Sequence, residues 1–503
     1  MNVENDFAKL AELLKARHEW LLVNRAGKSF ALAASEIEIE LKSNKILVGF
    51  LDEKGFQTWR VAAFEQKGDE ILLELKRNFE RDKEKIRLVP RVSASELTAA
   101  VELARLEKAN EIARVIIAET TGAKLVKVVL NAENGRFAQI LFETSKDRQV
   151  AAISDVSGAM THENLLAFAV FWLAKLRARK KNPIGKVWVL ADKKRAKNLQ
   201  KLRALLRPYW QNAIEIFEIS GQDARAQNEN ENAENQSLKK LETIGFSNLW
   251  REKTKKIELL ESFELSRAAR EIIEIAPDKI DAVFTKHGET LRFFGLSFAR
   301  VRTISGAEKV WFGIENGLQI LSENTLVEFS NLIEELKIYR RFNTENKRHA
   351  LFRLAPEAWL EAILRRNIKL LDANLILSPV HNQFRAERDK IDLLALRRDG
   401  RLIIVELKVA PDREMIFQAA DYWWKIELQR RAGNLRAAKI FDDLEISNEP
   451  AIVYLVAPFL NFHRDFEFPA QTISKEIEIF RFDLNENWRE SLKVLGRREI
   501  SDK

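Results

Sequence analysis

A glutamate and a lysine stand two residues apart in an otherwise apolar run, GRLIIVELKVAP at Gly400–Pro411. Charged side chains are seldom buried unless they are paired or bind something. The tripeptide Glu-Leu-Lys is not specific by itself, because it occurs four times in the chain. Three copies lie in short alternating segments or in a helical pattern, where charged residues occupy a solvated face. The fourth copy, Glu406–Lys408, lies in a run typical of a buried strand.

An aspartate fourteen residues before Glu406 also sets this fourth copy apart, since the same offset from the other three glutamates reaches no acid. The turn Arg398–Gly400 suits a three-residue hairpin loop, in which glycine takes the left-handed position. That loop places Asp392 directly opposite Glu406, and Lys408 shares their face of the sheet. A two-residue loop would put Asp392 on the opposite face, so the register decides the chemistry.

Two carboxylates that face each other in an apolar sheet repel and raise each other's pKa. A divalent cation turns this repulsion into binding, because Mg²⁺ and Mn²⁺ prefer carboxylate oxygens, waters and phosphate oxygens. The nearby Lys408 could then orient a water molecule, help to deprotonate it, or offset charge on a phosphate. The alternative is purely structural, with both acids satisfied by Lys408 and Arg388.

Two flanking helical patterns carry further polar residues. In the helix expected after the hairpin, Gln418 and Tyr422 are four residues apart and share one face. In the helix expected before it, Pro356 stands near the start and Glu357 could supply a third acid. An ordinary amphipathic helix accounts equally for Gln418 and Tyr422, and the neighbouring aromatic pair Trp423 and Trp424 is expected to pack in the core.

This ordered set of residues resembles the PD-(D/E)xK nuclease superfamily, which has the restriction-endonuclease-like fold. The pattern is most similar to the mismatch-specific endonuclease branch and, through its QxxxY helix, to RecB-type nucleases. The resemblance rests on Glu357, Leu360 and Asn367 in the first helix, on the hairpin DGRLIIVELK, and on the QxxxY helix. It covers about residues 356–482, and the segment RAERDKID departs from it because no glycine shortly precedes Asp392.

The resemblance also implies roles for individual residues. It implies that Asp392 and Glu406 bind Mg²⁺ or Mn²⁺ together with the backbone carbonyl of Leu407, and that Glu357 supports this metal site. Lys408 would assist the attacking water. Gln418 and Tyr422 would position the scissile strand or the lysine.

The chain as a whole limits the class of protein. Its 503 residues exceed what one core supports, so three or four domains are expected. With 46% hydrophobic and 31% charged residues, the composition is that of an ordinary globular protein. A cytoplasmic location is expected. The absence of cysteine excludes disulfides, thiol nucleophiles and cysteine-bound metals. The six histidines are scattered, and no glycine-rich phosphate loop occurs, which argues against an ATP-driven function.

The patterns along the chain predict a multidomain α/β protein. The expected parts are an N-terminal helix with a small β-barrel or sandwich, an α/β domain with a basic segment, a flexible linker, a middle α/β domain, and a nuclease domain with a mixed sheet flanked by helices. Their bounds are 1–95, 96–219, 220–238, 239–348 and 349–503.

The middle of the chain could contain a degenerate duplicate. A weak repeat relates Ala113–Ile117 to Ala269–Ile273 at an offset of 156 residues, through duplication or through chance. If instead the region 113–219 is a relative of the C-terminal fold, it has lost the chemistry. Its candidate metal strand keeps Asp155 but has Ser157 where a lysine would be needed.

A basic segment is the expected footprint of a nucleic-acid partner, DNA more than RNA. Between Lys175 and Arg207 there are thirteen Lys or Arg residues and one acid, Asp192. Solvated helix faces are the alternative. The candidate nucleic-acid contacts are Lys175, Arg177, Arg179, Lys180, Lys181, Lys193, Lys194, Arg195 and Lys197.

Together these patterns predict an endonuclease that uses Mg²⁺ or Mn²⁺ to hydrolyse DNA phosphodiesters, in DNA repair or in defence against foreign DNA. The alternatives are a nucleic-acid-binding protein that keeps the fold without cutting, and an RNA-directed nuclease. No membrane partner is expected, and a homodimer remains open.

Overall fold

The computed structural model describes most of the chain, in twelve stretches. These are residues 3–24, 29–52, 55–77, 82–91, 94–145, 149–220, 237–257, 264–285, 288–304, 306–314, 318–378 and 391–500. The predicted linker 220–238 and Arg388 therefore lie largely or wholly outside the described residues. The chain divides into two units, Met1–Ala104 and Arg105–Lys503. None of the described helices is long and apolar enough to cross a membrane.

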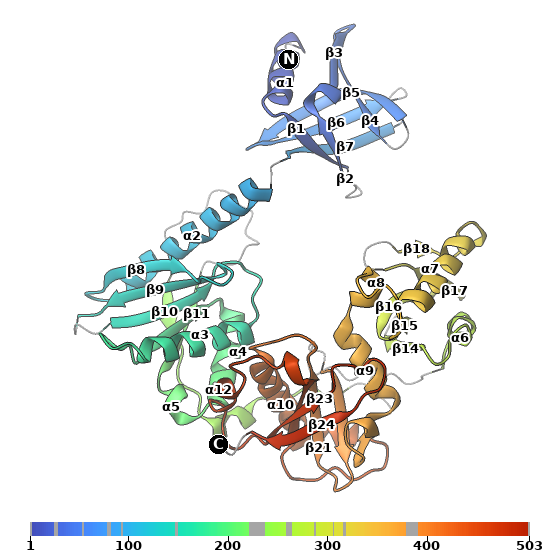
Figure 1. Cartoon of the computed structure of the whole chain (residues 1–503). Helices are drawn as coiled ribbons and strands as arrows, with labels where there is room; N and C mark the ends of the chain where they lie inside the picture. Colours follow the sequence, from blue (N-terminus) through green and yellow to red (C-terminus); the bar gives the residue numbers. More distant parts are fainter. Residues whose placement is uncertain are drawn as a thin grey trace. The chain divides into compact units, whose positions relative to one another are not determined.

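The first unit contains helix α1 and a curled, seven-stranded antiparallel sheet (Figure 1). The strands alternate apolar and polar residues, so one face buries a core that includes Trp20, Ile71 and Leu73. The indole of Trp20 donates to the Leu14 carbonyl and fixes α1 on that core. The order is β2-β1-β7-β6-β5-β4-β3, and the bounds are α1 Val3–Lys15, β1 Glu19–Asn24, β2 Ser29–Ala33, β3 Glu38–Lys42, β4 Lys45–Asp52, β5 Gly55–Lys67, β6 Glu70–Arg77 and β7 Asp82–Pro90.

The next region forms a mixed six-stranded sheet in the order β13-β12-β11-β10-β9-β8. Strands β10, β11 and β12 run parallel, and the outer pairings are antiparallel. Helices α3 and α4 cover one face, and α2 contributes to a core on the other. The bounds are α2 Ala94–Glu119, β8 Lys124–Leu130, β9 Phe137–Glu143, β10 Gln149–Asp155, α3 His162–Arg177, β11 Val187–Ala191, α4 Lys193–Ala204, α5 Pro208–Gln211, β12 Ile214–Ile219 and β13 Leu238–Lys240.

A purely antiparallel five-stranded sheet follows, in the order β14-β15-β16-β17-β18. Its core packs against α6 and α7. The bounds are α6 Arg267–Glu274, β14 Ile280–Thr285, β15 Gly288–Phe293, β16 Leu296–Ile304, β17 Ala307–Phe312, β18 Gln319–Ile320 and α7 Leu326–Tyr339.

The C-terminal region forms a second mixed six-stranded sheet, in the order β19-β20-β21-β22-β23-β24. Strands β21, β22 and β23 run parallel, and the other pairings are antiparallel. Helix α9 packs on one face and α10 on the other. The bounds are α8 Ala350–Arg353, α9 Pro356–Arg366, β19 Leu375–Leu377, β20 Leu393–Arg397, β21 Leu402–Leu407, α10 Met415–Arg431, α11 Asn434–Ala437, β22 Ile452–Pro458, α12 Glu467–Ala470, β23 Ile479–Leu484 and β24 Val494–Glu499.

The two mixed sheets have the same topology. In each, two antiparallel pairings are followed by two parallel pairings and a final antiparallel one. Helix α3 connects the first parallel pair in one sheet, and α10 does so in the other. We call the folds built on β8–β13 and β19–β24 the first copy and the second copy. The fold of the second copy thus recurs within the chain, as the degenerate-duplicate hypothesis predicts.

The repeat at an offset of 156 residues does not align corresponding elements. Phe137 begins β9, whereas Phe293, at the same offset, ends β15. The sheet that contains Phe293 is wholly antiparallel, so it does not share the topology of either copy. The first copy is related instead to the C-terminal sheet.

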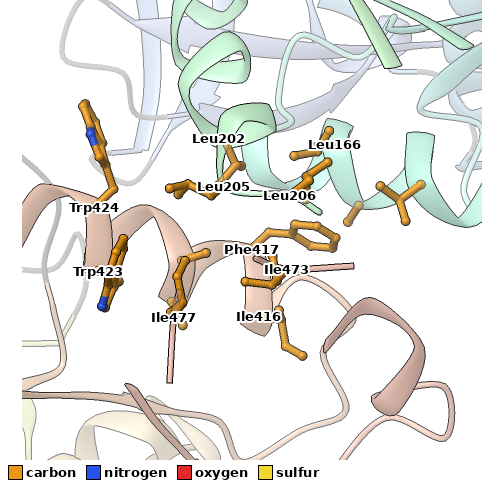
Figure 2. Packing of buried hydrophobic residues seen from close by; sticks show 14 of the residues in the cluster. Leu166, Leu202, Leu205, Leu206, Ile416, Phe417, Trp423, Trp424, Ile473 and Ile477 are labelled. Carbon is orange, nitrogen blue, oxygen red and sulfur yellow. The ribbon is translucent and has the colours of Figure 1, made fainter. Parts of the chain in front are cut away.

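The two copies share one hydrophobic core. Helix α3 packs against α10, and α4 contacts α10 as well. The buried residues Leu166 and Leu205 of the first copy and Phe417 and Ile473 of the second belong to one continuous cluster (Figure 2). Residues from the two regions therefore bury a common apolar surface.

Candidate active site

The site is built on the hairpin of β20 and β21. Leu393 pairs with Val405, and the Arg397 amide donates to the Arg401 carbonyl at 2.8 Å. This register sets Asp392 opposite Glu406 and confirms the predicted three-residue loop. Gly400 has a φ of +83°, and a Cβ there would come within 2.9 Å of the Glu445 carbonyl oxygen, so the loop requires glycine.

Glu406 is the most buried charged residue of this hairpin, with 2% of its surface exposed. Its Oε1 accepts a hydrogen bond from Lys408 Nζ at 2.8 Å. Its Oε2 is buried and accepts no hydrogen bond from any residue that the structure describes. Burial and the charge of Asp392 raise the pKa of Glu406 to about 8, against the opposing influence of Lys408. A buried carboxylate with an unsatisfied oxygen is costly unless a cation or a proton joins it.

Asp392 lies beside Glu406 at the open end of the hairpin. Its Oδ2 accepts a hydrogen bond of 2.8 Å from the Leu407 amide, which fixes the carboxylate against the end of β21. The Leu407 side chain is fully buried on the opposite face of the sheet. Asp392, the Leu407 backbone and Glu406 are therefore held together by the strand pairing itself.

Lys408 carries the positive charge of the site. Its ammonium lies 2.8 Å from Glu406 and 3.6 Å from Asp412 Oδ2. Burial alone would lower the pKa of Lys408, but the charges of Glu406, Asp412 and Glu357 raise it above its usual value. The lysine is consequently protonated and neutralises the acids around it.

Helix α9 brings Glu357 towards this site. Proline at its first turn suits a helix start, and the half-buried Glu357 acts electrostatically on Lys408. One turn later, Glu361 is buried and lies 3.5 Å from both Arg292 and Arg365. Glu361 thus ties α9 to the antiparallel sheet, and Glu357 is the acid of this helix whose charge acts on Lys408.

Helix α10 supplies Gln418 and Tyr422, both half-buried. Gln418 Oε1 is buried and accepts no hydrogen bond from the described residues. Tyr422 packs against the shared core, and Lys425 Nζ lies 5.9 Å from its ring centre. Trp423 and Trp424 are 1% and 3% exposed, which confirms that they are core residues.

The donor set fits a divalent cation. It offers carboxylate oxygens from Asp392 and Glu406 on two facing strands, and the orphaned Glu406 Oε2 lacks the partner that a cation would provide. Among the described residues the three acids Glu357, Asp392 and Glu406 do not place ligand atoms within 4.8 Å of one another. Lys408 is instead the cation in contact with Glu406.

Sequence reasoning missed a second polar cluster, which joins the two copies. His162 at the start of α3 lies 3.2 Å from Glu163 and 3.5 Å from Asp421 of α10. These three residues have potential ligand atoms within 4.8 Å of one another. Lys425 Nζ already lies 2.5 Å from Asp421 Oδ2, so a positive charge is present. No local pattern links His162 to an aspartate in another copy, so the sequence carries no signal for this cluster.

The basic segment is divided between two ends of a sheet. Lys175, Arg179, Lys180 and Lys181 are exposed before β11 begins, and Lys193, Lys194 and Lys197 are exposed after β11 ends. Arg177 donates to the Gly185 carbonyl and stacks over the Tyr209 ring. The two exposed groups are therefore separated by the length of β11.

Arg195 is turned inward rather than to solvent. Its guanidinium donates to Asp155 at 2.7 Å and also pairs with Asp192. Asp155 is 1% exposed and accepts further hydrogen bonds from Ser157. Burial would raise the pKa of Asp155, but the hydrogen bonds from Ser157 and Arg195 lower it overall. The Asp155 carboxylate is thus fully satisfied by protein groups.

No family model matches the chain. No curated protein matches it either. Solved structures that resemble it include EndoMS in its apo form, with 13% identity over 39% of this chain and 90% of that one and a TM-score of 0.15. A complex of EndoMS with double-stranded DNA resembles it with 12% identity over 36% of this chain and 81% of that one, at a TM-score of 0.13. Similarity at these TM-scores carries no argument about this chain.

Proposed function

We propose that the chain is a metal-dependent endonuclease that hydrolyses phosphodiester bonds in DNA. The observation that carries the proposal is the pairing of Asp392 with Glu406, whose Oε2 is buried without a partner among the described residues. As pure structure this arrangement is unfavourable, because burial and a neighbouring like charge both oppose ionisation of Glu406. Sites of this kind persist where the unfavourable group has a function.

Asp392, Glu406 and the Leu407 backbone would hold Mg²⁺ or Mn²⁺, with Glu357 in support. A divalent cation at such a site supplies charge stabilisation for the phosphate and lowers the pKa of a nearby water. Lys408, which is protonated, would orient the attacking water and offset negative charge on the phosphate. Gln418, whose Oε1 is available, would position the water or the strand.

The reaction is a hydrolysis with a simple balance. A water oxygen bonds to phosphorus while one P–O ester bond breaks, and a water proton ends on the departing oxygen. The products are one strand end with a hydroxyl group and one with a phosphomonoester. The exposed lysines around α3 and α4 would hold the nucleic acid through its backbone phosphates.

Cleavage assays test the proposal against a non-cleaving nucleic-acid-binding protein. Purified full-length chain and its Lys408→Ala variant are incubated with single-stranded, duplex and branched DNA and with RNA, in Mn²⁺, Mg²⁺ or EDTA. We expect DNA cleavage that requires the metal and is lost in the variant. Salt-sensitive binding without cleavage in any metal would support the non-cleaving protein, and preferential cleavage of RNA would support an RNA-directed nuclease.

A further inference from the structure

We propose that the two copies pair within one chain and that only the second copy has a hydrolytic site, which we call the live site. The chain would then nick one strand of duplex DNA per encounter. This inference rests on the proposed function and specifies its product. It follows from two features of the structure, which are the state of the first copy's equivalent site and the way in which the two copies are joined.

The first copy retains the scaffold of the site but not its chemistry. Asp155 is the last residue of β10, and Glu406 is the last residue but one of β21. Both side chains lie on the face of their sheet that packs in the shared core. The residue paired with Asp155 across β9 is Phe137, at the position that Asp392 holds opposite Glu406. Two residues after Asp155 stands Ser157, where the second copy has Lys408. The carboxylate pair and the lysine are both absent.

In the first copy, the cation that contacts the carboxylate is Arg195. Its guanidinium lies 2.7 Å from Asp155 Oδ2, while Oδ1 accepts hydrogen bonds from Ser157 N and Oγ at 2.8 and 2.7 Å. The amides of Gly158 and Met160 also donate to this carboxylate. Asp155 has no oxygen left unsatisfied, in contrast to Glu406. This arrangement stabilises the first copy without a metal.

Three contacts bring the equivalent ends of the two sheets together. Arg413, just before α10, pairs with Glu133 of the β8–β9 loop at 2.6 Å. The Asn164 side chain at the start of α3 interacts with Glu414. His162 reaches Asp421. The loops that follow β10 and β21 therefore lie next to each other. The live site at Glu406 and the equivalent position at Asp155 are thus on the same side of the paired copies.

The face of α10 that carries Phe417 is covered by the first copy. Phe417 of α10 is fully buried against the cluster that contains Leu166, Leu202 and Leu206 of the first copy (Figure 2). A second chain cannot use this face of α10 unless the shared core opens, which would expose a large apolar surface. The partner of the live site is therefore the first copy, and a chain bound to duplex DNA brings one set of hydrolytic groups.

The test uses closed circular supercoiled duplex DNA with the full chain at a low ratio of protein to DNA. We expect supercoiled DNA to convert to the nicked circle, with linear DNA appearing only after a lag. Linear DNA that forms at the same rate as supercoiled DNA disappears would overturn the inference while upholding the proposed function. If neither supercoiled DNA nor any other DNA substrate is cleaved in Mg²⁺ or Mn²⁺, the proposed function itself would be wrong.

Matched variants assign the nick to one copy. Asp392→Asn should abolish nicking, whereas Asp155→Asn and Ser157→Ala should keep the nicking rate within about twofold, because neither changes the live site. Thermal unfolding confirms that each variant is folded. A loss of more than tenfold in the folded Ser157→Ala variant would show that the first copy takes part in hydrolysis and would contradict the inference.

Discussion

The guanidinium of Arg195 lies 2.7 Å from the Asp155 carboxylate, at the strand end where the second copy carries Glu406. Protein groups satisfy every oxygen of Asp155, while Glu406 keeps a buried oxygen with no partner among the described residues. Two copies of one topology thus treat an equivalent carboxylate in opposite ways. The carboxylate of the first copy is held by protein groups, whereas that of the second copy keeps an oxygen that a proton or a cation could join.

Replacing Asp392 by asparagine should stabilise the metal-free protein while removing activity. The amide oxygen of asparagine can still accept from the Leu407 amide, but it no longer repels Glu406. We expect a gain of about 1 kcal/mol in the free energy of unfolding, as is common when a functional site loses its strain. Thermal or denaturant unfolding in EDTA measures this gain. A clear loss of stability would show that the two acids are not in repulsion.

Phe417→Ala should destabilise both copies together. Phe417 is fully buried in their shared core, and truncation of a buried phenylalanine costs about 3–5 kcal/mol. Hydrogen exchange should therefore accelerate in β11 as well as in β22. The control is Phe312→Ala, which acts on the separate core of the antiparallel sheet. Faster exchange in β22 alone would mean that the two copies do not unfold as one unit.

Gly295→Ala should disturb the start of α9 and, through it, Glu357. Gly295 has a φ of +79°, and a Cβ there would lie 1.9 Å from the Ala358 carbonyl oxygen. Gly306 has a φ of +80° with no atom within 4 Å of its Cβ position, so Gly306→Ala isolates the cost of the backbone conformation. We expect the Gly295 variant to be less stable than the Gly306 variant by about 2 kcal/mol and to cleave more slowly. Equal stability of the two variants would show that an alanine side chain at position 295 does not clash with the Ala358 carbonyl.

His162 should make the stability of the second unit depend on pH. Burial lowers its pKa and Lys425 opposes its charge, but the nearby carboxylate of Asp421, with help from Glu163, raises the pKa overall. A raised pKa means that the folded state binds the proton more tightly than the unfolded state. This stabilisation is complete below about pH 6.5 and is lost as the pH rises through the raised value.

The variant His162→Gln tests this dependence, because it keeps a polar group without a titrating charge. We expect its unfolding temperature to fall less than that of the unaltered chain between pH 6 and pH 8.5. The measurement is calorimetry at constant ionic strength in several buffers. An identical fall in both proteins would show that His162 gains no proton affinity on folding.

The sequence predicts the hairpin well because its information is local. Alternation fixes which residues of β21 face the core, and Arg398–Gly400 fixes the loop, so the register of Asp392 and Glu406 follows. The tryptophan pair of α10 is likewise predictable from its apolar neighbours.

Contacts between distant segments are not predictable in this way. The Arg195–Asp155 pair joins residues forty positions apart, and Arg413–Glu133 joins residues 280 apart. Likewise, the relation between the two copies lies in strand order and direction, which different sequences can adopt. The weak repeat at an offset of 156 residues relates Ala113–Ile117 to Ala269–Ile273 because apolar residues recur at similar spacings in unrelated elements.

The most direct test of the account compares DNA cleavage by Asp392→Asn and Asp399→Asn in Mn²⁺. Both variants remove one carboxylate from the same hairpin, but Asp399 lies in the loop and pairs with the Arg397 side chain. We expect Asp392→Asn to lower the cleavage rate by at least about a thousandfold, whereas Asp399→Asn should retain it. Equal cleavage by both variants would contradict the assignment of Asp392 and Glu406 as the site of hydrolysis.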